Sequence, residues 1–157
     1  MIQERTCEGP ERDVPVTVLL SKLILLERDA TAAYVRVLHR LEDAGVRQEM
    51  TRVLETRQQR LAELTILSFS LRSASPDEAA AKHYLPAGRV AVEALSGDGA
   101  ILTAMLAGEA ETVTAYEQAS AHPKALPKSR AIFERAHRDA IQHLSWMEQA
   151  ARALQES

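Results

Sequence analysis

Two glutamate–tyrosine pairs carry most of the chemistry that this sequence can offer. Glu27 stands seven residues before Tyr34, and Glu109 stands seven residues before Tyr116. Seven residues are close to two turns of an α-helix, so the carboxylate and the phenol of each pair fall on one stripe of a helix. Apolar residues at spacings of three and four surround both pairs, which places the glutamates on or beside the core-facing side. A carboxylate there needs a partner, because burying a bare charge is costly.

The composition favours helices as the elements that position these pairs. Hydrophobic residues make up 46% of the chain, whereas aromatic residues make up only 4%, and β-branched residues are also scarce. Such a mixture suits long amphipathic helices better than strands. At 157 residues the chain has the length of one domain with a real core.

The apolar periodicity and the capping signals predict four helices in two hairpins. The first is expected from Asp13 and Pro15 to Ala44, with Gly45 as its stop, and the second covers about residues 46–73. The third is expected from Asp98 to about residue 121, and the fourth starts near residues 127–129. Residues 1–13 are expected to be a flexible leader and residues 14–157 a single domain. About residues 74–99 are too long for a tight turn and are expected to form a crossover.

Three stretches of the sequence are informative together with the two hairpins and the inward glutamates: Leu106-Ala107-Gly108-Glu109, Thr114-Ala115-Tyr116-Glu117, and the run from His143 to Glu148. In this combination the chain resembles the ferritin-like superfamily over about residues 15–156. The chain looks nearest to the small bacterial ferritin-like families that are mostly uncharacterised or stress-associated. The resemblance implies an all-α fold, an up-down-down-up four-helix bundle with a long crossover between the second and third helices.

The resemblance also implies a di-iron centre, from which this sequence departs. Such a centre takes one inward glutamate from each of two helices and a Glu-x-x-His pair from each of the other two. Glu27 and Glu109 match the single glutamates and His143 matches one histidine, but Ala140 stands where its glutamate is expected. Arg57 and Arg60 occupy the positions of the other pair, and arginine stays protonated and binds no metal.

The charges therefore predict an interior ion cluster in place of a functional di-iron centre. Two guanidiniums would neutralise two carboxylates, with the tyrosines hydrogen-bonded at the edge. The predicted members are Glu27, Arg57, Arg60, Glu109, Tyr34 and Tyr116. On this interpretation the protein has no cofactor, no catalytic residue and no nameable enzymatic activity.

An alternative interpretation keeps a metal at the same place. Glu27, Glu109 and His143 would hold a single Fe, Mn or Zn ion with open coordination positions. Both arginines would then have to swing outward along their stems. An oxidase-like or peroxide-related activity would be the corresponding expectation, by analogy of fold.

The net charge and the hydropathy of the chain limit the classes of partner that the protein is expected to bind. A formal net charge of -3 gives no electrostatic case for nucleic acid or an anionic membrane surface, and no apolar run is long enough to span a membrane. The single cysteine, Cys7, excludes an internal disulfide, and no secretory signal is visible, so a cytoplasmic protein is expected. Apolar residues of the crossover, Tyr84, Leu85 and Val90, predict a homodimer.

Overall fold

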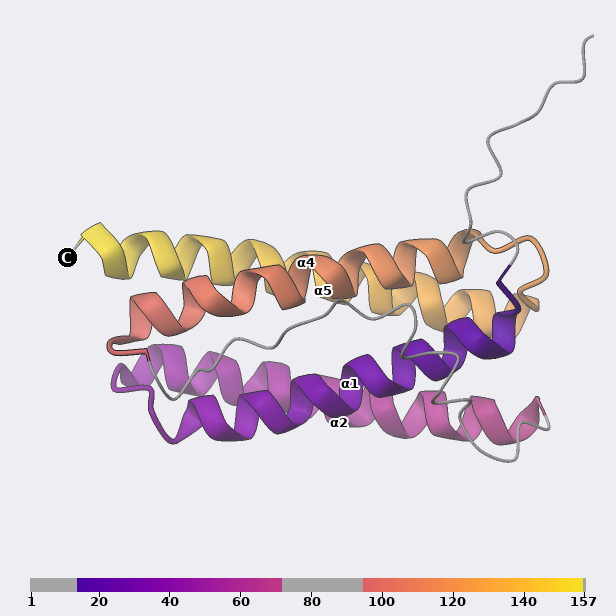
Figure 1. Ribbon diagram of the computed structural model, residues 1–157, viewed down its shortest axis with the longest axis horizontal. Helices are drawn as coiled ribbons and strands as arrows, with labels where there is room; N and C mark the ends of the chain where they lie inside the picture. Colours follow the sequence, from indigo (N-terminus) through magenta and orange to yellow (C-terminus); the bar gives the residue numbers. More distant parts are fainter. Residues whose placement is uncertain (1–13, 72–94, 157) are drawn as a thin grey trace, which may run out of the picture.

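The computed structural model describes residues 14–71 and 95–156, and in this part the chain forms α-helices and no strand (Figure 1). The helices are α1 (Val16–Leu38), α2 (Ala44–Ser70), α4 (Asp98–Ala121) and α5 (Pro127–Glu156). They lie side by side along the long axis of the molecule. The expected all-α, four-helix class is confirmed. The predicted leader with Cys7 and most of the predicted crossover, including Tyr84, Leu85 and Val90, lie outside the described residues.

The turn between α1 and α2 differs from the expectation. α1 ends at Leu38 and does not reach Ala44, and Gly45 lies inside the first turn of α2 and does not stop a helix. The reason is Asp43, whose Oδ1 accepts a hydrogen bond from the backbone N–H of Val46 at 2.9 Å. Aspartate is among the strongest N-cap residues, so this contact sets the start of α2.

Two contacts fix the position of α4 against α1. At its start, the buried carboxylate of Asp98 accepts hydrogen bonds from the backbone N–H groups of Glu42 (3.0 Å) and Asp43 (2.8 Å) in the α1–α2 turn. At its end, the ring Nε2 of buried His122 lies 2.7 Å from the backbone oxygen of Val14, just before α1. Each end of α4 thus meets the opposite end of α1.

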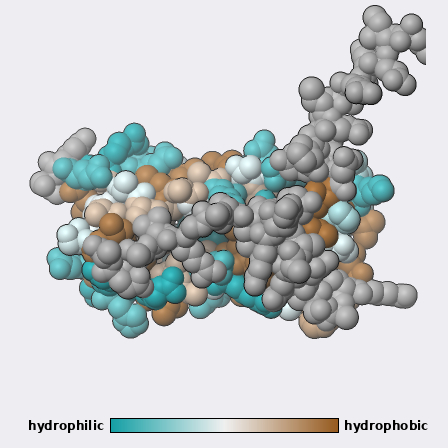
Figure 2. All heavy atoms as spheres, in the orientation of Figure 1, coloured by the Kyte–Doolittle hydropathy of each residue, from teal (hydrophilic) through white to brown (hydrophobic). Residues whose placement is uncertain are grey.

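The helix pairs α1–α2 and α4–α5 pack closely, whereas α2 and α5 touch at few positions. On the face shown in Figure 2, hydrophilic side chains gather at the ends and outer edges of the bundle, with apolar surface between them. None of the described helices combines the length and the apolar character needed to cross a membrane.

The interior contains two apolar clusters with a polar layer between them. One cluster includes Leu23, Leu64 and Phe133, and the other includes Val37, Met50 and Met147. Along α1, α2 and α4 the chain passes from one cluster to the other through a buried charged residue. These residues are Glu27, Arg57 and Glu109. The polar layer is therefore the part of the core that requires a chemical explanation.

Candidate functional site

The centre of the polar layer is the guanidinium of Arg57, which lies between two carboxylates. Its Nη1 is 3.2 Å from both carboxylate oxygens of Glu27, and its Nη2 is 2.7 Å from Oε2 of Glu109. The three residues come from α2, α1 and α4, and each is at most 3% exposed. Because the guanidinium fork presents several donors in one plane, one arginine satisfies two carboxylates.

The tyrosines complete the cluster in a crossed arrangement. The hydroxyl of Tyr34 donates to Oε1 of Glu109 at 2.5 Å, and the hydroxyl of Tyr116 donates to Oε1 of Glu27 at 2.8 Å. Each phenol thus bonds the glutamate of the opposite helix, although it shares a helical stripe with its own. Each carboxylate receives one charged and one neutral donor, which ties α1 to α4 across the interior.

Burial and the neighbouring charges shift the ionisation of these groups. Burial, followed by the negative charge of Glu109, raises the pKa of Tyr34 well above its ordinary value. Burial, followed by Glu27, does the same to the pKa of Tyr116. For Arg57, burial acts to lower the pKa, but the two carboxylates outweigh it and the pKa is raised. At neutral pH the phenols are therefore hydrogen-bond donors and the guanidinium is charged.

A further contact holds Arg57 in place. Its Cζ lies 5.4 Å from the centroid of the Tyr34 ring, within the range of a cation–π interaction. The hydroxyl of Thr112 is 3.4 Å from Nη2. The Nε atom of Arg57 is buried and has no hydrogen-bond partner in the part of the chain that the structure describes.

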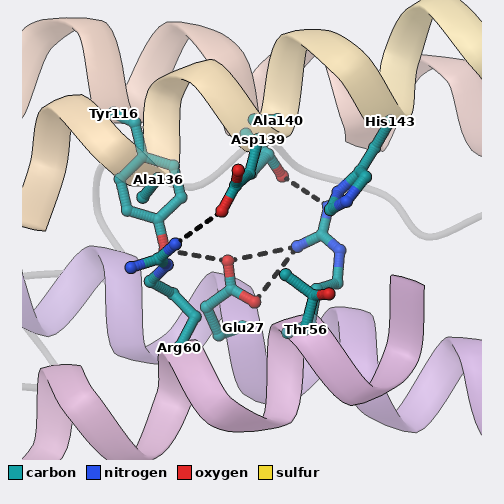
Figure 3. A pocket seen from close by; sticks show the side chains of 10 residues that line it. Glu27, Thr56, Arg60, Tyr116, Ala136, Asp139, Ala140 and His143 are labelled. Carbon is teal, nitrogen blue, oxygen red and sulfur yellow. Dashed lines mark hydrogen bonds and ion pairs between the residues drawn. The ribbon is translucent and has the colours of Figure 1, made fainter. Parts of the chain in front are cut away.

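Arg60 lies outside this central group, contrary to its predicted place. Its Nη2 is 2.7 Å from Oδ2 of Asp139 on α5 (Figure 3). Its Nη1 is 2.5 Å from Oε1 of Glu63 on α2. A step of three residues turns the helix by about 300°, so Arg60 leans toward α5 while Arg57 points to α1 and α4. Asp139 neighbours the apolar seam of α5 and was expected to face water or to pair with an arginine, and that arginine is Arg60.

The fourth wall of the site, on α5, is lined by small residues and leaves a cavity. The cavity measures about 20 Å³, and its lining includes Glu27 of α1, Arg60 of α2, Tyr116 of α4, and Ala136, Ala140 and His143 of α5 (Figure 3). Burial, followed by the charge of Arg57, lowers the pKa of His143, so its imidazole is neutral at pH 7. His143 is half-buried and lies at the edge of the cluster, beside the ion pairs.

A groove adjoins this cavity on the side where α2 and α5 touch little. Its volume is about 290 Å³. Three residues, Thr56, Asp139 and His143, line both hollows. The remaining lining residues of the groove are Glu49, Arg52, Val53, Gln142 and Trp146.

The donor set at the centre does not fit a di-iron centre. Both oxygens of Glu27 and one oxygen of Glu109 accept hydrogen bonds from Arg57, so a cation already stands between the carboxylates. The four-carboxylate, two-imidazole set that two irons require is reduced here to Glu27, Glu109 and His143. Across residues 14–71 and 95–156, no three His, Cys, Asp or Glu side chains are grouped as metal ligands would be.

Comparisons with protein-family models, with curated proteins and with solved structures find no match to this chain. Of the six predicted cluster members, the structure brings five together and places Arg60 beside them. The periodicity of α2 could not separate Arg57 from Arg60, because both lie on the inner half of the helix.

Proposed function

We propose that the chain is a metal-free member of the ferritin-like superfamily, in which a buried ion-pair cluster takes the place of the di-iron centre. Its role is non-catalytic and of the stress-associated kind found in the small bacterial families that it resembles. The single observation that carries the proposal is the position of Arg57. Its guanidinium bridges the inward glutamates of α1 and α4, the two helices that supply single glutamates in the di-iron pattern.

The proposal includes an up-down-down-up topology, with a crossover that joins α2 to α4. The contacts of Asp98 and His122 support it, because they pair each end of α4 with the opposite end of α1. The short turn from Ala121 to Pro127 returns α5 alongside α4. Under this topology α2 and α4 run in the same direction.

The proposal is tested by restoring the ligands that the resemblance implies. A triple variant, Arg57→Glu, Arg60→His and Ala140→Glu, supplies a Glu-x-x-His pair on α2 and another on α5. Because Glu27, Glu109 and His143 are already present, we expect the variant to bind two ferrous or manganous ions per chain, measured by elemental analysis after desalting. The unchanged protein, treated in parallel, is expected to retain none.

Two outcomes contradict the proposal, and they differ in meaning. Stoichiometric metal in the unchanged protein, lost in Glu109→Ala, favours the single-ion alternative at Glu27, Glu109 and His143. That alternative has one observation in its support, since His143 and Glu27 line the same cavity. A folded triple variant that binds no metal shows that these positions do not correspond to ferritin-like ligands. The homodimer remains a prediction, and light scattering would test it.

A further inference from the structure

The glutamate and tyrosine positions of the first half of the chain recur in the second half, whereas Arg57 and Arg60 have Ala140 and His143 as their counterparts. Glu27 and Glu109 are 82 residues apart, as are Tyr34 and Tyr116. A separation of 83 residues relates Arg57 to Ala140 on α5. The structure places a guanidinium at one of these positions and only a methyl group at the other. The cavity of about 20 Å³ lies at Ala140, where the second cation of a symmetric cluster would stand.

The charges around this cavity are unequal. In the cluster, the cavity and the groove, three guanidiniums face four carboxylates: Arg52, Arg57 and Arg60 against Glu27, Glu49, Glu109 and Asp139. Glu63 also contacts Arg60, but Arg135 is a second partner of that carboxylate at 3.4 Å and balances it. One negative charge is therefore in excess, and part of it is buried, where compensation by a cation is most favourable.

The shape of the two hollows suits a ligand with a small head and a larger body. A volume of about 20 Å³ holds one atom group of the size of water or ammonium. Three of its lining residues, Glu27, Thr56 and Asp139, carry oxygen acceptors, and the guanidinium residues Arg57 and Arg60 line it as well. The adjoining groove of about 290 Å³ is bounded by the half-buried ring of Trp146 and by Val53, which offer an apolar wall.

We propose that the α2–α5 groove binds a small primary amine with a single positive charge. The ammonium head enters the cavity beside Ala140 and takes the place of the missing guanidinium near Glu27, while an aromatic or apolar body lies against Trp146. The ligand class follows from the acceptors, from the excess of one negative charge and from the apolar wall. The inference rests on the proposed metal-free cluster, whose own test is the metal analysis.

The binding experiment uses 2-phenylethylamine as the probe and the full-length protein. Trp146 is the only tryptophan of the chain and lines the groove, so its fluorescence reports binding directly. We expect a saturable change with 2-phenylethylamine. The neutral analogue 2-phenylethanol should bind at least about tenfold more weakly, because the charged hydrogen bonds are lost. Equal binding of the alcohol, or no saturable signal with the amine, overturns the proposal.

Matched variants locate the binding, with calorimetry as the readout. Ala140→Leu fills the cavity and is expected to weaken 2-phenylethylamine binding at least about tenfold. Ala131→Leu is the control, because Ala131 is exposed on the same helix. If Ala140→Leu does not fold by circular dichroism, Asp139→Asn removes one negative charge from both hollows and is expected to weaken binding as well.

Unchanged affinity in folded Ala140→Leu, or in Asp139→Asn where that variant is used, overturns the assignment of the site. If the protein contains no metal and does not bind 2-phenylethylamine, only the amine-binding proposal is overturned. Stoichiometric metal in the unchanged protein overturns the proposed function instead.

Discussion

At the scale of single residues, one arginine determines the character of the site. Arg57 is buried with two carboxylates, and its Nη atoms satisfy both. A buried ion pair of this kind need not stabilise a protein more than apolar residues would, but removal of one partner leaves uncompensated charge in the core. The cluster is therefore sensitive to single substitutions at Arg57, and less so to substitutions that remove all of its charges together.

Arg57→Leu is expected to lower the free energy of unfolding by about 3–5 kcal/mol, because two buried carboxylates lose their cation. Arg57→Lys keeps the positive charge but loses the forked donors of the guanidinium, so it should lower the free energy of unfolding by less than Arg57→Leu does. Arg52→Leu, on the exposed side of α2, is the control and should cost less than about 1 kcal/mol. Urea denaturation measures all three, and a cost for Arg57→Leu no greater than that of the control would contradict the account.

The tyrosines predict a loss of stability at alkaline pH. Their pKa values are raised in the folded protein by burial and by the facing glutamates, so the folded state resists ionisation of the phenols. Stability from this source is complete below the unfolded pKa of about 10 and is lost as the pH rises through it toward the raised folded value. In Tyr34→Phe this decline should be shallower, as measured by urea denaturation across that range. If the free energy of unfolding of Tyr34→Phe falls with pH as steeply as that of the unchanged protein, Tyr34 is not a buried, protonated phenol.

Residue types and spacing were enough to identify the inward glutamates and an arginine partner, because charge balance in a core leaves few options. They could not indicate that Tyr34 bonds Glu109 and Tyr116 bonds Glu27. That exchange depends on how α1 and α4 pack, which no single helix specifies. Asp139 was expected to face water or to pair with an arginine, but the sequence could not identify Arg60 as its partner, because the two residues lie on different helices.

At the scale of elements, one aspartate joins two turns. Asp98 stands at the predicted start of the third helix, but it is not the N-cap of α4, because Gly97 occupies that position with φ of 89°, a left-handed conformation that suits glycine. The carboxylate of Asp98 instead binds the backbone of the α1–α2 turn. Helix periodicity located α4 correctly, but the boundary between α1 and α2 depended on capping by Asp43, which competed with the stop signal of Gly45.

Asp98→Ala is expected to lower the free energy of unfolding by about 1–3 kcal/mol, because it removes two hydrogen bonds from backbone N–H groups to a buried carboxylate. Asp43→Ala removes only a helix cap and should cost about 1 kcal/mol. Thermal or urea unfolding compares the two. If Asp98→Ala is neutral, the contact between α4 and the α1–α2 turn does not contribute to stability.

At the scale of the whole molecule, two apolar clusters enclose a charged layer. The class of the fold was predictable, because apolar periodicity and scarce aromatics leave few alternatives to a helical bundle. The layer gives the bundle a specific register, since Arg57 meets both glutamates only when α1, α2 and α4 are correctly aligned. The open side between α2 and α5 is where the layer approaches the surface, and where the proposed amine would enter.

The most direct test of the central claim is anomalous X-ray diffraction from crystals grown in the presence of ferrous or manganous ions. The account predicts electron density for the Arg57 guanidinium between Glu27 and Glu109 and no anomalous peak at that position. An anomalous peak bridging the two carboxylates, with the Arg57 side chain turned away from both of them, would contradict it.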